Sequence, residues 1–499
     1  MLFHDQEFLF LFLPIALVGL LILKKKLPDL VVWWLVFCSL AFYSFHGFLH
    51  IPVLLTSILF NYYIGLLIEK SRLHYKNTGL LAIGITINLA ILAFFKYTDF
   101  FLSNLAYLGL IKSQKTNIGL PLAISFFTFQ QIAYLVDLKR GEISSSRFID
   151  YCAFITFFPQ LIAGPIVRHQ KIVPQIVDQV WKKTSKEWIW VGLCLFSFGL
   201  FKKNYLADGL RPLADSIFNA TNEGTTLSFA EAWLGSCAFG LQIYFDFSAY
   251  SEMAIGLGLL FGLRLPINFN SPYKSKNIID FWRRWHITLS EFLRDYLYNS
   301  LGGNRNGVAA GITNVLIVMT IGGLWHGASW TFVAWGVIHG FLIGFCHITR
   351  AIKKKTKCKE TNSIWSSQLL TLVLVTFAWV FFRSEDFKQA FDISKSMLGF
   401  NGLDLPRFLG SSTNLDYLRF HGGLPNQVTD ITLIPLLALC LLLVILAPNT
   451  IQILKINVKA DSPLTLPSPK VIFASGILFF FSVKASFETI SYEFLYFRF

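Results

Sequence analysis

Apolar segments close to bilayer thickness recur along the whole chain, and Lys, Arg, Asn or Gly residues separate them. A helix needs about 20 mostly apolar residues to cross a membrane. Because the backbone in lipid must satisfy its own hydrogen bonds, such segments predict helices and not strands. We therefore expect an all-α fold, a polytopic transmembrane helical bundle with about 11–12 spanning helices and additional re-entrant or interfacial helices. The expected spans are Phe8–Leu23, Leu30–Gly47, Ile51–Ile68, Gly79–Lys96, Leu120–Val136, Trp188–Phe201, Ala232–Phe261, Ala309–Leu324, Trp330–Ile348, Gln368–Phe382, Leu433–Ala447 and Val471–Phe487.

The segment Tyr151–Gly164 differs from these spans. It is shorter than a membrane-crossing helix, and it contains Pro159. Irregular backbone at membrane depth occurs where other parts of the protein bury it. We expect a re-entrant or buried segment here, not a crossing.

Composition agrees with a single integral membrane domain over residues 1–499, with a motif-bearing core at about residues 120–348. Hydrophobic residues make up 54% of the chain and charged residues 14%, which is too little charge to cover large soluble domains. The net charge of +14 lies in short clusters between the apolar segments, which argues against a nucleic-acid partner. The seven cysteines show neither a metal-binding spacing nor a disulfide framework.

The basic loops agree with one orientation in the membrane. With the N-terminus outside, the basic segments Lys24–Lys26, Lys70–Lys76, Lys139–Lys186, Arg264–Arg305 and Arg350–Lys359 all fall on one side, which is then cytoplasmic. Lys202 and Lys203 fall on the opposite side and are exceptions to this pattern. Asp5 and Glu7 precede the first apolar segment, so it reads as a spanning helix and not as a signal peptide.

The segment Asn268–Leu301 places polar groups, which are costly to bury in a membrane, within an apolar chain. From Asp280 onward the spacing predicts a helix with an apolar stripe, and its members are Trp282, Trp285, Leu289, Phe292, Leu293 and Tyr296. Arg283, His286, Ser290 and Arg294 fall on a more polar face. A basic amphipathic helix with tryptophan on its apolar side lies in the membrane interface or packs along a bundle.

His286 has two interpretations. The cations of Arg283 and Arg284 disfavour a protonated imidazole, and a neutral histidine can accept or donate a proton. From the residues alone, His286 is either such a proton-transfer group or a hydrogen-bonded structural histidine.

His326 lies in a glycine-rich stretch between two apolar helices. Gly322, Gly323 and Gly327 permit a break in the helix and a close approach of backbone or substrate. Trp325 and Trp330 are expected to form apolar walls. Ionisable groups at membrane depth usually face a cavity or a partner, and the alternative is a histidine that ties two helices together. His339 and His347 follow on the next helix without glycines around them, and we expect both to be structural.

Other polar groups at membrane depth have both structural and functional interpretations. Asp246 and Glu252 lie in the span Ala232–Phe261, where each carboxylate is costly unless it is paired or faces water. Clustered histidines also raise the possibility of a metal site, but no H-E-x-x-H or H-x-x-E-H pattern is present, so we expect no metal.

Six motifs together resemble the membrane-bound O-acyltransferase family, close to its bacterial alginate O-acetyltransferase branch and its D-alanyl-transferring relatives. These motifs cover most of residues 125–340, and the flanking helices fit the family loosely. They are SFFTFQQIAYLVD (Ser125–Asp137), FFPQLIAGPIVR (Phe157–Arg168), QIYFDFSAYSEMAIGLG (Gln242–Gly258), NFNSPYKSKNIIDFWRRWHITLSEFLRDYLY (Asn268–Tyr298), LGGNR (Leu301–Arg305) and GGLWHGASWTFVAWGVIHG (Gly322–Gly340).

The resemblance implies a helical bundle in which a funnel reaches the active site, with His326 as the catalytic histidine and His286 as the second family histidine. We expect substrate or tunnel-lining roles for Trp325, Gly327, Trp330, Trp282, Asp246 and Gln242. On the donor side we expect Arg283, Arg284 and Arg294 to steer a phosphorylated donor arm.

The function expected from the resemblance is O-acyl transfer in a bacterial inner membrane. A cytoplasmic thioester, either acetyl-coenzyme A or an acyl carrier protein, would supply an acyl group, most simply acetyl. The acceptor would be a hydroxyl of an extracytoplasmic polysaccharide or other cell-envelope molecule, reached either directly or through a periplasmic partner acyltransferase. D-alanyl or other acyl transfer to teichoic acid or lipid stays open, as do a proton-coupled transporter and a non-enzymatic export scaffold. No tightly bound cofactor is expected.

Overall fold

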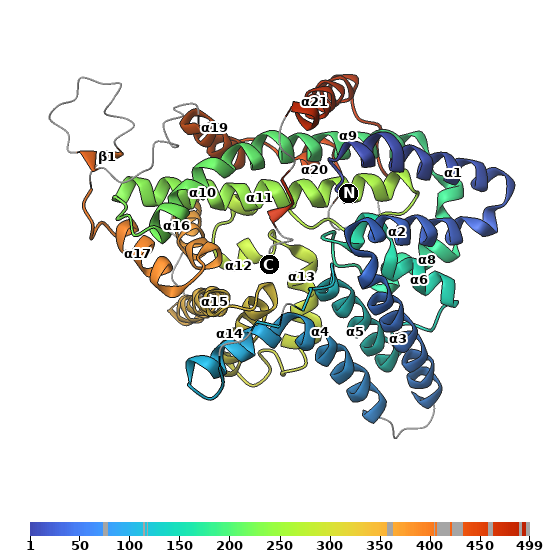
Figure 1. The fold of residues 1–499 in the computed structure, drawn as a ribbon, viewed down its shortest axis with the longest axis horizontal. Coiled ribbons are helices and arrows are strands. Elements are labelled where there is room, and N and C mark those ends of the chain that lie inside the picture. Colours follow the sequence, from blue (N-terminus) through green and yellow to red (C-terminus); the bar gives the residue numbers. More distant parts are fainter. Residues whose placement is uncertain are drawn as a thin grey trace. The chain divides into compact units, whose positions relative to one another are not determined.

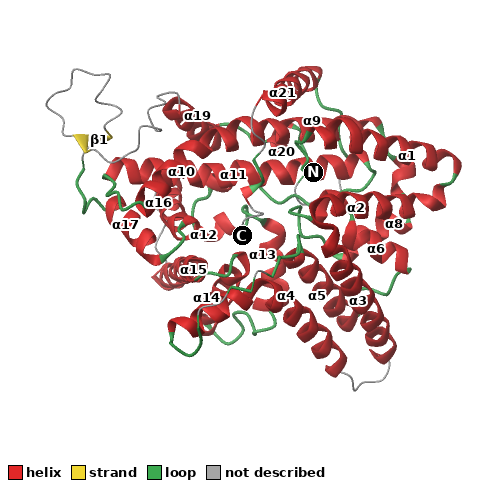
Figure 2. Ribbon diagram, in the orientation of Figure 1, coloured by secondary structure: helices red, strands yellow, loops and turns green. Residues whose placement is uncertain are grey.

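Helices make up nearly all of the regular structure in the computed structural model (Figures 1 and 2). The structure describes residues 1–72, 78–112, 115–116, 118–356, 363–403, 405–406, 420–421, 433–457, 463–488 and 492–495. Among these, strand occurs in two-residue segments, β1 (Leu405–Pro406) and β2 (Phe420–His421), which pair in parallel. The predicted all-α fold is therefore confirmed.

Eight of the described helices are long and apolar enough to cross a membrane. They span Phe8–Lys26, Pro28–Phe45, Phe48–Ser71, Gly79–Tyr107, Val308–His326, Trp330–Lys353, Ile364–Arg383 and Pro469–Glu488. The other four predicted spans are also helical, in α5 (Ile124–Arg140), α9 (Lys186–Phe201), α11 (Phe229–Leu260) and α19 (Leu433–Leu446). Of these, α19 is an apolar helix shorter than the eight, and α11 carries buried carboxylates along its length.

The first of two compact units comprises residues 1–200, 249–268 and 450–493. The N-terminal third of this unit consists of hairpins of apolar helices, and the last long helix of the unit is α21 (Pro469–Glu488). The α-helices are α1 (Leu13–Lys26), α2 (Val31–Gly47), α3 (Ile51–Arg72), α4 (Thr78–Tyr107), α5 (Ile124–Arg140), α6 (Phe148–Thr156), α7 (Phe158–Leu161), α8 (His169–Val177), α9 (Lys186–Phe201), α20 (Thr450–Ile453) and α21 (Pro469–Glu488). Short π or 3₁₀ segments lie at Phe8–Phe12, Pro28–Leu30, Phe48–His50 and Val180–Lys183.

The segment predicted to be re-entrant or buried is broken and buried, as expected. Helix α6 ends at Thr156, and α7 begins at Phe158. The break frees backbone groups, and side chains satisfy them. The Ser39 hydroxyl accepts a hydrogen bond from the Phe158 N–H (3.0 Å), and the Gln160 amide donates one to the Phe154 carbonyl (2.6 Å). Non-helical backbone is thus tolerated here because the first unit encloses it.

The second compact unit comprises residues 201–248, 269–449 and 494–499, and it contains His286, His326 and His339. Helix α11 contributes residues to both units. The helices are α10 (Asp208–Asn222), α11 (Phe229–Leu260), α12 (Ile278–Trp282), α13 (Ile287–Phe292), α14 (Val308–His326), α15 (Trp330–Thr356), α16 (Ile364–Arg383), α17 (Phe387–Met397) and α19 (Leu433–Leu446). Short π or 3₁₀ segments lie at Lys202–Ala207, Pro272–Lys274 and Leu293–Tyr298.

Helices α14 and α15 pack backbone to backbone, and this crossing positions the histidines. Gly323 of α14 and Gly336 of α15 face each other, since a Cβ atom built on Gly336 would lie 3.2 Å from the Gly323 Cα. Small residues at such crossings let the backbones of membrane helices approach closely. The glycines predicted to permit a break do so, because α14 ends at His326, Gly327 is extended, and α15 begins at Trp330.

We predict that Gly336→Ala weakens this crossing. The new Cβ would lie 2.2 Å from the Met319 carbonyl oxygen, and a backbone atom cannot move aside alone. Overpacking of this kind costs about 1–3 kcal/mol, against a gain of up to ~1 kcal/mol from replacing a helical glycine. The melting temperature in detergent should fall. Gly476→Ala on α21 is the control, because no atom lies within 4 Å of its Cβ position. A Gly336→Ala protein that melts at or above wild type would contradict the prediction.

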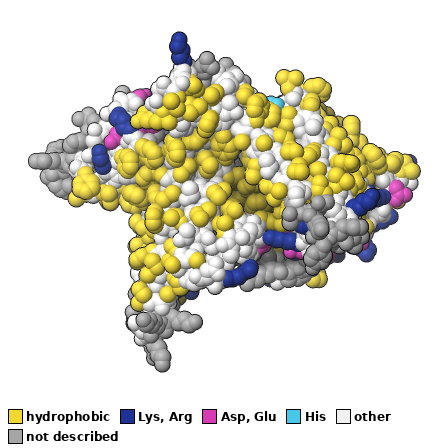
Figure 3. Space-filling view, turned by 90° about the horizontal axis from the view of Figure 1, so that it is seen from below, with side chains coloured by type: hydrophobic (Ala, Val, Ile, Leu, Met, Phe, Trp, Pro, Cys, Tyr) yellow, Lys and Arg dark blue, Asp and Glu magenta, His cyan; other side chains and the backbone are white. Residues whose placement is uncertain are grey.

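Large apolar side chains remain exposed on the membrane-crossing helices, among them Phe37 at 62% and Phe480 at 65%. Figure 3 shows hydrophobic side chains over much of the face in view. Soluble monomers rarely expose contiguous apolar surface on this scale. Together with the eight apolar helices, this identifies a multi-pass membrane protein.

Candidate active site

The amphipathic segment is interrupted at His286, so the prediction of one continuous helix from Asp280 was wrong. Helix α12 ends at Trp282, and α13 begins at Ile287. Between them, the Arg284 carbonyl accepts a hydrogen bond from the Asn270 N–H (2.9 Å), a contact with the preceding loop that replaces helical pairing. His286 adopts left-handed backbone angles, φ 42° and ψ 56°. Such a conformation costs a non-glycine residue about 1–3 kcal/mol and is often associated with functional sites.

The break turns His286 away from the polar face and into the second unit. Its side chain is fully buried against Phe247, whose ring centroid lies 4.7 Å away at nearly a right angle, and its ring lies 6.4 Å from that of Trp325. Burial lowers the pKa of His286 to about 3, so the imidazole is neutral at physiological pH. We predicted the neutral form from the neighbouring arginines, but burial is what favours it.

We predict that this buried histidine makes the protein acid-sensitive. The folded protein holds His286 neutral down to about pH 3, whereas the unfolded chain binds a proton below about pH 6.5. Stability is therefore complete above pH 6.5 and falls as the pH drops toward 3, by up to ~1.4 kcal/mol per pH unit. His286→Asn cannot titrate, so its melting temperature should fall less than that of the wild type between about pH 7.5 and pH 5.

The comparison with wild type isolates His286 from other histidines. Burial also lowers the pKa of His169 to about 4, but His169 is present in both proteins, and its contribution cancels. Parallel losses of melting temperature in the two proteins would show that His286 is not the acid-sensitive group.

His326 is the last residue of α14, and aromatic rings surround it. Its side chain is 5% exposed. Ring centroids lie 4.9 Å away for Trp325, 5.1 Å for Trp335 and 5.2 Å for Phe382 of α16. The Trp325 ring is thus near both histidines, with His326 at 4.9 Å and His286 at 6.4 Å between ring centroids. The two histidines predicted to carry the chemistry therefore belong to one aromatic cluster.

Helix α15 adds two residues to this cluster that sequence analysis did not assign to the site. Trp335 and His339 are one helical turn apart, and their ring centroids lie 4.8 Å apart. Trp282, predicted to line the tunnel, donates its indole N–H to His339 Nδ1 (3.2 Å). The spacing of four residues between Trp335 and His339 was the available signal, but the contact of Trp335 with His326 depends on the α14–α15 crossing.

Gly327 and Trp330, the other predicted lining residues near His326, differ in their placement. Gly327 is buried, and a Cβ atom there would lie 2.2 Å from the Phe332 ring, so the residue must be small. Trp330 lies in the first turn of α15 and is 52% exposed, and its role as a wall of the site stays a prediction. Trp335, one and a half turns further along, lies beside His326.

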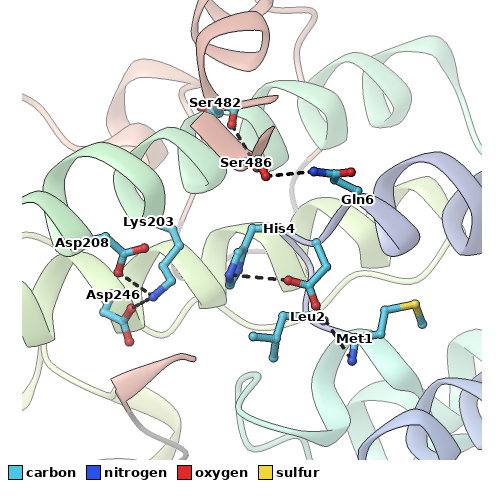
Figure 4. Close-up of polar contacts among 10 residues, drawn as sticks. Met1, Leu2, His4, Gln6, Lys203, Asp208, Asp246, Ser482 and Ser486 are labelled. Atoms are coloured by element: carbon cyan, nitrogen blue, oxygen red, sulfur yellow. Dashed lines mark hydrogen bonds and ion pairs between the residues drawn. The ribbon is translucent and has the colours of Figure 1, made fainter. Parts of the chain in front are cut away.

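Asp246, also predicted to line the tunnel, is buried in a cluster of ions (Figure 4). The Lys203 ammonium lies 2.9 Å from Asp246 and 2.8 Å from Asp208, and Asp246 also accepts a hydrogen bond from the Leu495 N–H (2.7 Å). Burial raises the pKa of Asp208 to about 6, although Lys203 opposes this shift. Gln242, one turn before Asp246 on α11, is buried too, and its side-chain oxygen has no hydrogen-bond partner among the described residues.

The three arginines expected on the donor side are not equivalent. Arg283 is exposed. Arg284 pairs with Asp280 of the same segment (3.0 Å), and Arg294 pairs with its neighbour Asp295 (2.7 Å). Local carboxylates therefore neutralise two of the three guanidinium groups. Among the described residues, no group of three or more His, Cys, Asp or Glu side chains is placed to hold a metal ion.

The cluster lies within the part of the chain that a known family matches. The model of the membrane-bound O-acyltransferase (MBOAT) family matches residues 30–384, which include His286, His326 and the rings around them. The chain belongs to this family. It is therefore an acyltransferase, as the sequence motifs predicted.

Named relatives resemble this acyltransferase over about half to about four fifths of its length. A peptidoglycan O-acetyltransferase of Helicobacter pylori is 43% identical over 436 residues, which are 81% of each chain. A probable alginate O-acetylase, AlgI, of Pseudomonas aeruginosa is 39% identical over 409 residues, 80% of this chain and 75% of the relative. A teichoic acid D-alanyltransferase of Bacillus subtilis is 26% identical over 269 residues, 52% of this chain and 67% of the relative.

Proposed function

We propose that this acyltransferase moves an acetyl group from a thioester donor to a hydroxyl of an extracytoplasmic cell-envelope polysaccharide. Similarity to named relatives supports acetyl over D-alanyl. The O-acetyl-transferring relatives are 43% and 39% identical over about four fifths of the chain, whereas the D-alanyl-transferring relative is 26% identical over about half of it. Peptidoglycan is the acceptor to examine first, and an alginate-like polysaccharide is the second.

The observation that carries this proposal is the buried His326 at the end of a membrane-crossing helix, enclosed by Trp325, Trp335 and Phe382. An imidazole can take a proton at neutral pH. His326 removes the proton of the acceptor hydroxyl as that oxygen attacks the thioester carbonyl carbon. The new C–O bond forms, the C–S bond breaks, and the proton returns from His326 to the leaving sulfur. General base catalysis contributes about 10²–10⁴-fold.

The other parts of the cluster support this step without exchanging protons. The aromatic walls exclude water, which would otherwise hydrolyse the thioester. His286, neutral and fully buried, orients a substrate group. We assign it a positional role, so its loss should lower the rate less than the loss of His326. The proposed donor is acetyl-coenzyme A or an acyl carrier protein thioester, and Arg283, Arg284 and Arg294 lie on the side from which it arrives.

That side is proposed to be cytoplasmic, with the N-terminus outside the bacterial inner membrane. The basic loops support this orientation, and one exception to the pattern has a structural explanation. Lys203 is 1% exposed and neutralised by two carboxylates, so it is not a free loop cation. The same alternation puts Gly209–Thr226 and Arg383–Asp430 on the opposite side. The segments Lys70–Lys76, Arg350–Lys359 and Arg383–Asp430 lie partly outside the described residues.

We predict that a cysteine at Ser144, an exposed position in the basic loop after α5, is protected from an impermeant thiol reagent in intact cells. A cysteine at the exposed Thr226, on the opposite side, should be labelled, and it serves as the matched control. Labelling of Ser144→Cys with protection of Thr226→Cys would reverse the orientation. The donor-side assignment of the three arginines would then fail as well.

The function itself is tested by mass spectrometry of the cell envelope. Cells that carry the wild-type chain should contain O-acetyl groups on peptidoglycan or exopolysaccharide that are absent without the chain and absent with His326→Ala. D-alanyl esters in their place would favour the teichoic acid alternative. Solute uptake into vesicles without any acyl transfer would identify a transporter, and envelope acylation that survives His326→Ala would favour a scaffold. A periplasmic partner that completes transfer to the polymer should co-purify with the wild-type chain.

A further inference from the structure

Two buried N–H groups on neighbouring turns of α15 have no hydrogen-bond partner in the part of the chain that the structure describes, and the ring that carries one of them, Trp335, contacts His326. The indole N–H of Trp335 and the Nε2 atom of His339 have no hydrogen-bond partner among the described residues, although the side chains are 1% and 0% exposed. A buried donor left unsatisfied costs about 1–3 kcal/mol. Native proteins contain few such groups, and each calls for an explanation.

The hydrogen bonds of His339 define which of its nitrogens is the donor. Trp282 donates to His339 Nδ1 (3.2 Å), so Nδ1 carries no hydrogen and acts as the acceptor. A neutral imidazole then carries its hydrogen on Nε2. The open position of His339 is therefore an N–H, of the same kind as the open position of Trp335. Both N–H groups require a hydrogen-bond acceptor, because another donor cannot bond to either of them.

The surroundings limit what that acceptor can be. The Trp335 ring contacts the His326 ring at 5.1 Å and nearly a right angle, and it stacks on Trp379 at 5.7 Å. The crossing at Gly323 and Gly336 fixes α15 against α14, so the two donors are held by rigid helices. Preorganised donors in a dry site stabilise an oxygen on which negative charge develops, without reorganisation at the moment of reaction.

We infer that Trp335 Nε1–H and His339 Nε2–H bind the carbonyl oxygen of the acyl donor and stabilise the oxyanion that forms on it. This inference rests on the proposed acyl transfer. As the acceptor oxygen bonds to the carbonyl carbon, the carbonyl π pair moves to its oxygen, and both N–H groups donate to it. When the C–S bond breaks, the double bond re-forms. Neither residue gains or loses a proton, and both become catalytic residues alongside His326.

Trp335→Phe separates this role from a structural one. The substitution keeps an aromatic ring and removes an N–H that has no described partner, so a structural role predicts no loss of rate per folded molecule. An oxyanion role predicts a fall in kcat of about 10²–10³-fold, with little change in the donor KM. Trp379→Phe is the matched control. It removes the same ring volume from the same stack and also the bond from its N–H to the Tyr273 hydroxyl (3.2 Å). It should keep the wild-type kcat.

Two substitutions at His339 give a second, independent reading. Gln can accept from Trp282 and still offer an N–H, whereas Phe offers neither. His339→Gln should therefore retain more activity than His339→Phe at matched protein levels.

The assay uses membrane vesicles, acetyl-coenzyme A and peptidoglycan, with rates normalised to folded protein from thermal melts. Wild-type vesicles that transfer no acetyl group would overturn the proposed function and this inference with it. Active wild type with an equally active, folded Trp335→Phe protein would overturn this inference alone. Equal loss of kcat in Trp335→Phe and Trp379→Phe would do the same, because it would assign the effect to packing. The inference would be established by two results together. The kcat must fall in Trp335→Phe but not in Trp379→Phe, and His339→Gln must retain more activity than His339→Phe.

Discussion

Replacing His326 by alanine is expected to lower acyl transfer by about 10²–10⁴-fold while the protein stays folded. The His326 side chain is buried at the end of α14 and contacts aromatic rings. Alanine at this position has no group that can take a proton from the acceptor hydroxyl. The measurement is the rate of O-acetate incorporation per molecule of protein. Abundance and melting temperature must be determined for each variant, because misfolding imitates lost catalysis.

Two further variants decide between a base and a structural histidine. His326→Gln should fail as well, because an amide forms hydrogen bonds but accepts no proton at neutral pH. A structural histidine gives the opposite pattern, in which Gln rescues and Ala lowers stability and rate together. His347→Ala, on the more exposed part of α15, is the control for loss of a histidine at membrane depth. Wild-type rates from a folded His326→Ala protein would refute the proposed mechanism.

The helices and the break at His326 could be predicted because local sequence controls them. Apolar length determines a membrane helix, and glycine permits the break that separates α14 from α15. The path of His286 could not be predicted in this way. A hydrogen bond from Asn270 to the Arg284 carbonyl interrupts the helix, and it comes from a loop that local periodicity does not register. Periodicity therefore placed His286 on the polar face, whereas the structure buries it.

In the aromatic cluster and the ion cluster, too, local sequence predicts some features, and long-range contacts determine the others. The sequence predicts that Asp246 must be paired or face water, because a carboxylate at membrane depth is costly. Its partner, Lys203, precedes it by 43 residues and stood out in the sequence only as a misplaced cation. Likewise, Trp335 lies in a stretch of sequence typical of an ordinary apolar helix. Only the close crossing of α14 and α15 at Gly336 brings Trp335 to His326.

Lys203→Met is expected to destabilise the second unit by about 3–5 kcal/mol, the usual consequence of removing one partner from a buried ion pair. Lys203 and Asp246 are almost fully buried, and their charged atoms lie 2.9 Å apart. Without the ammonium, Asp246 and Asp208 are left as neighbouring carboxyl groups in an apolar site. They must take up protons or admit water, and either response costs free energy. Thermal melts in detergent measure the loss.

A double variant distinguishes the missing partner from the missing lysine side chain. Lys203→Met with Asp246→Leu removes both charges, and a buried pair replaced by apolar groups is often close to neutral in stability. The double variant should therefore be more stable than Lys203→Met alone, although Asp208 remains and limits the recovery. Lys202→Met, at the more exposed neighbouring position, should melt like the wild type. If Lys203→Met also melts like the wild type, the ion cluster does not stabilise the fold. Asp246→Leu is measured alone as well. If the loss of stability in the double variant equals the sum of the losses in Lys203→Met and Asp246→Leu, Lys203 and Asp246 are not energetically coupled.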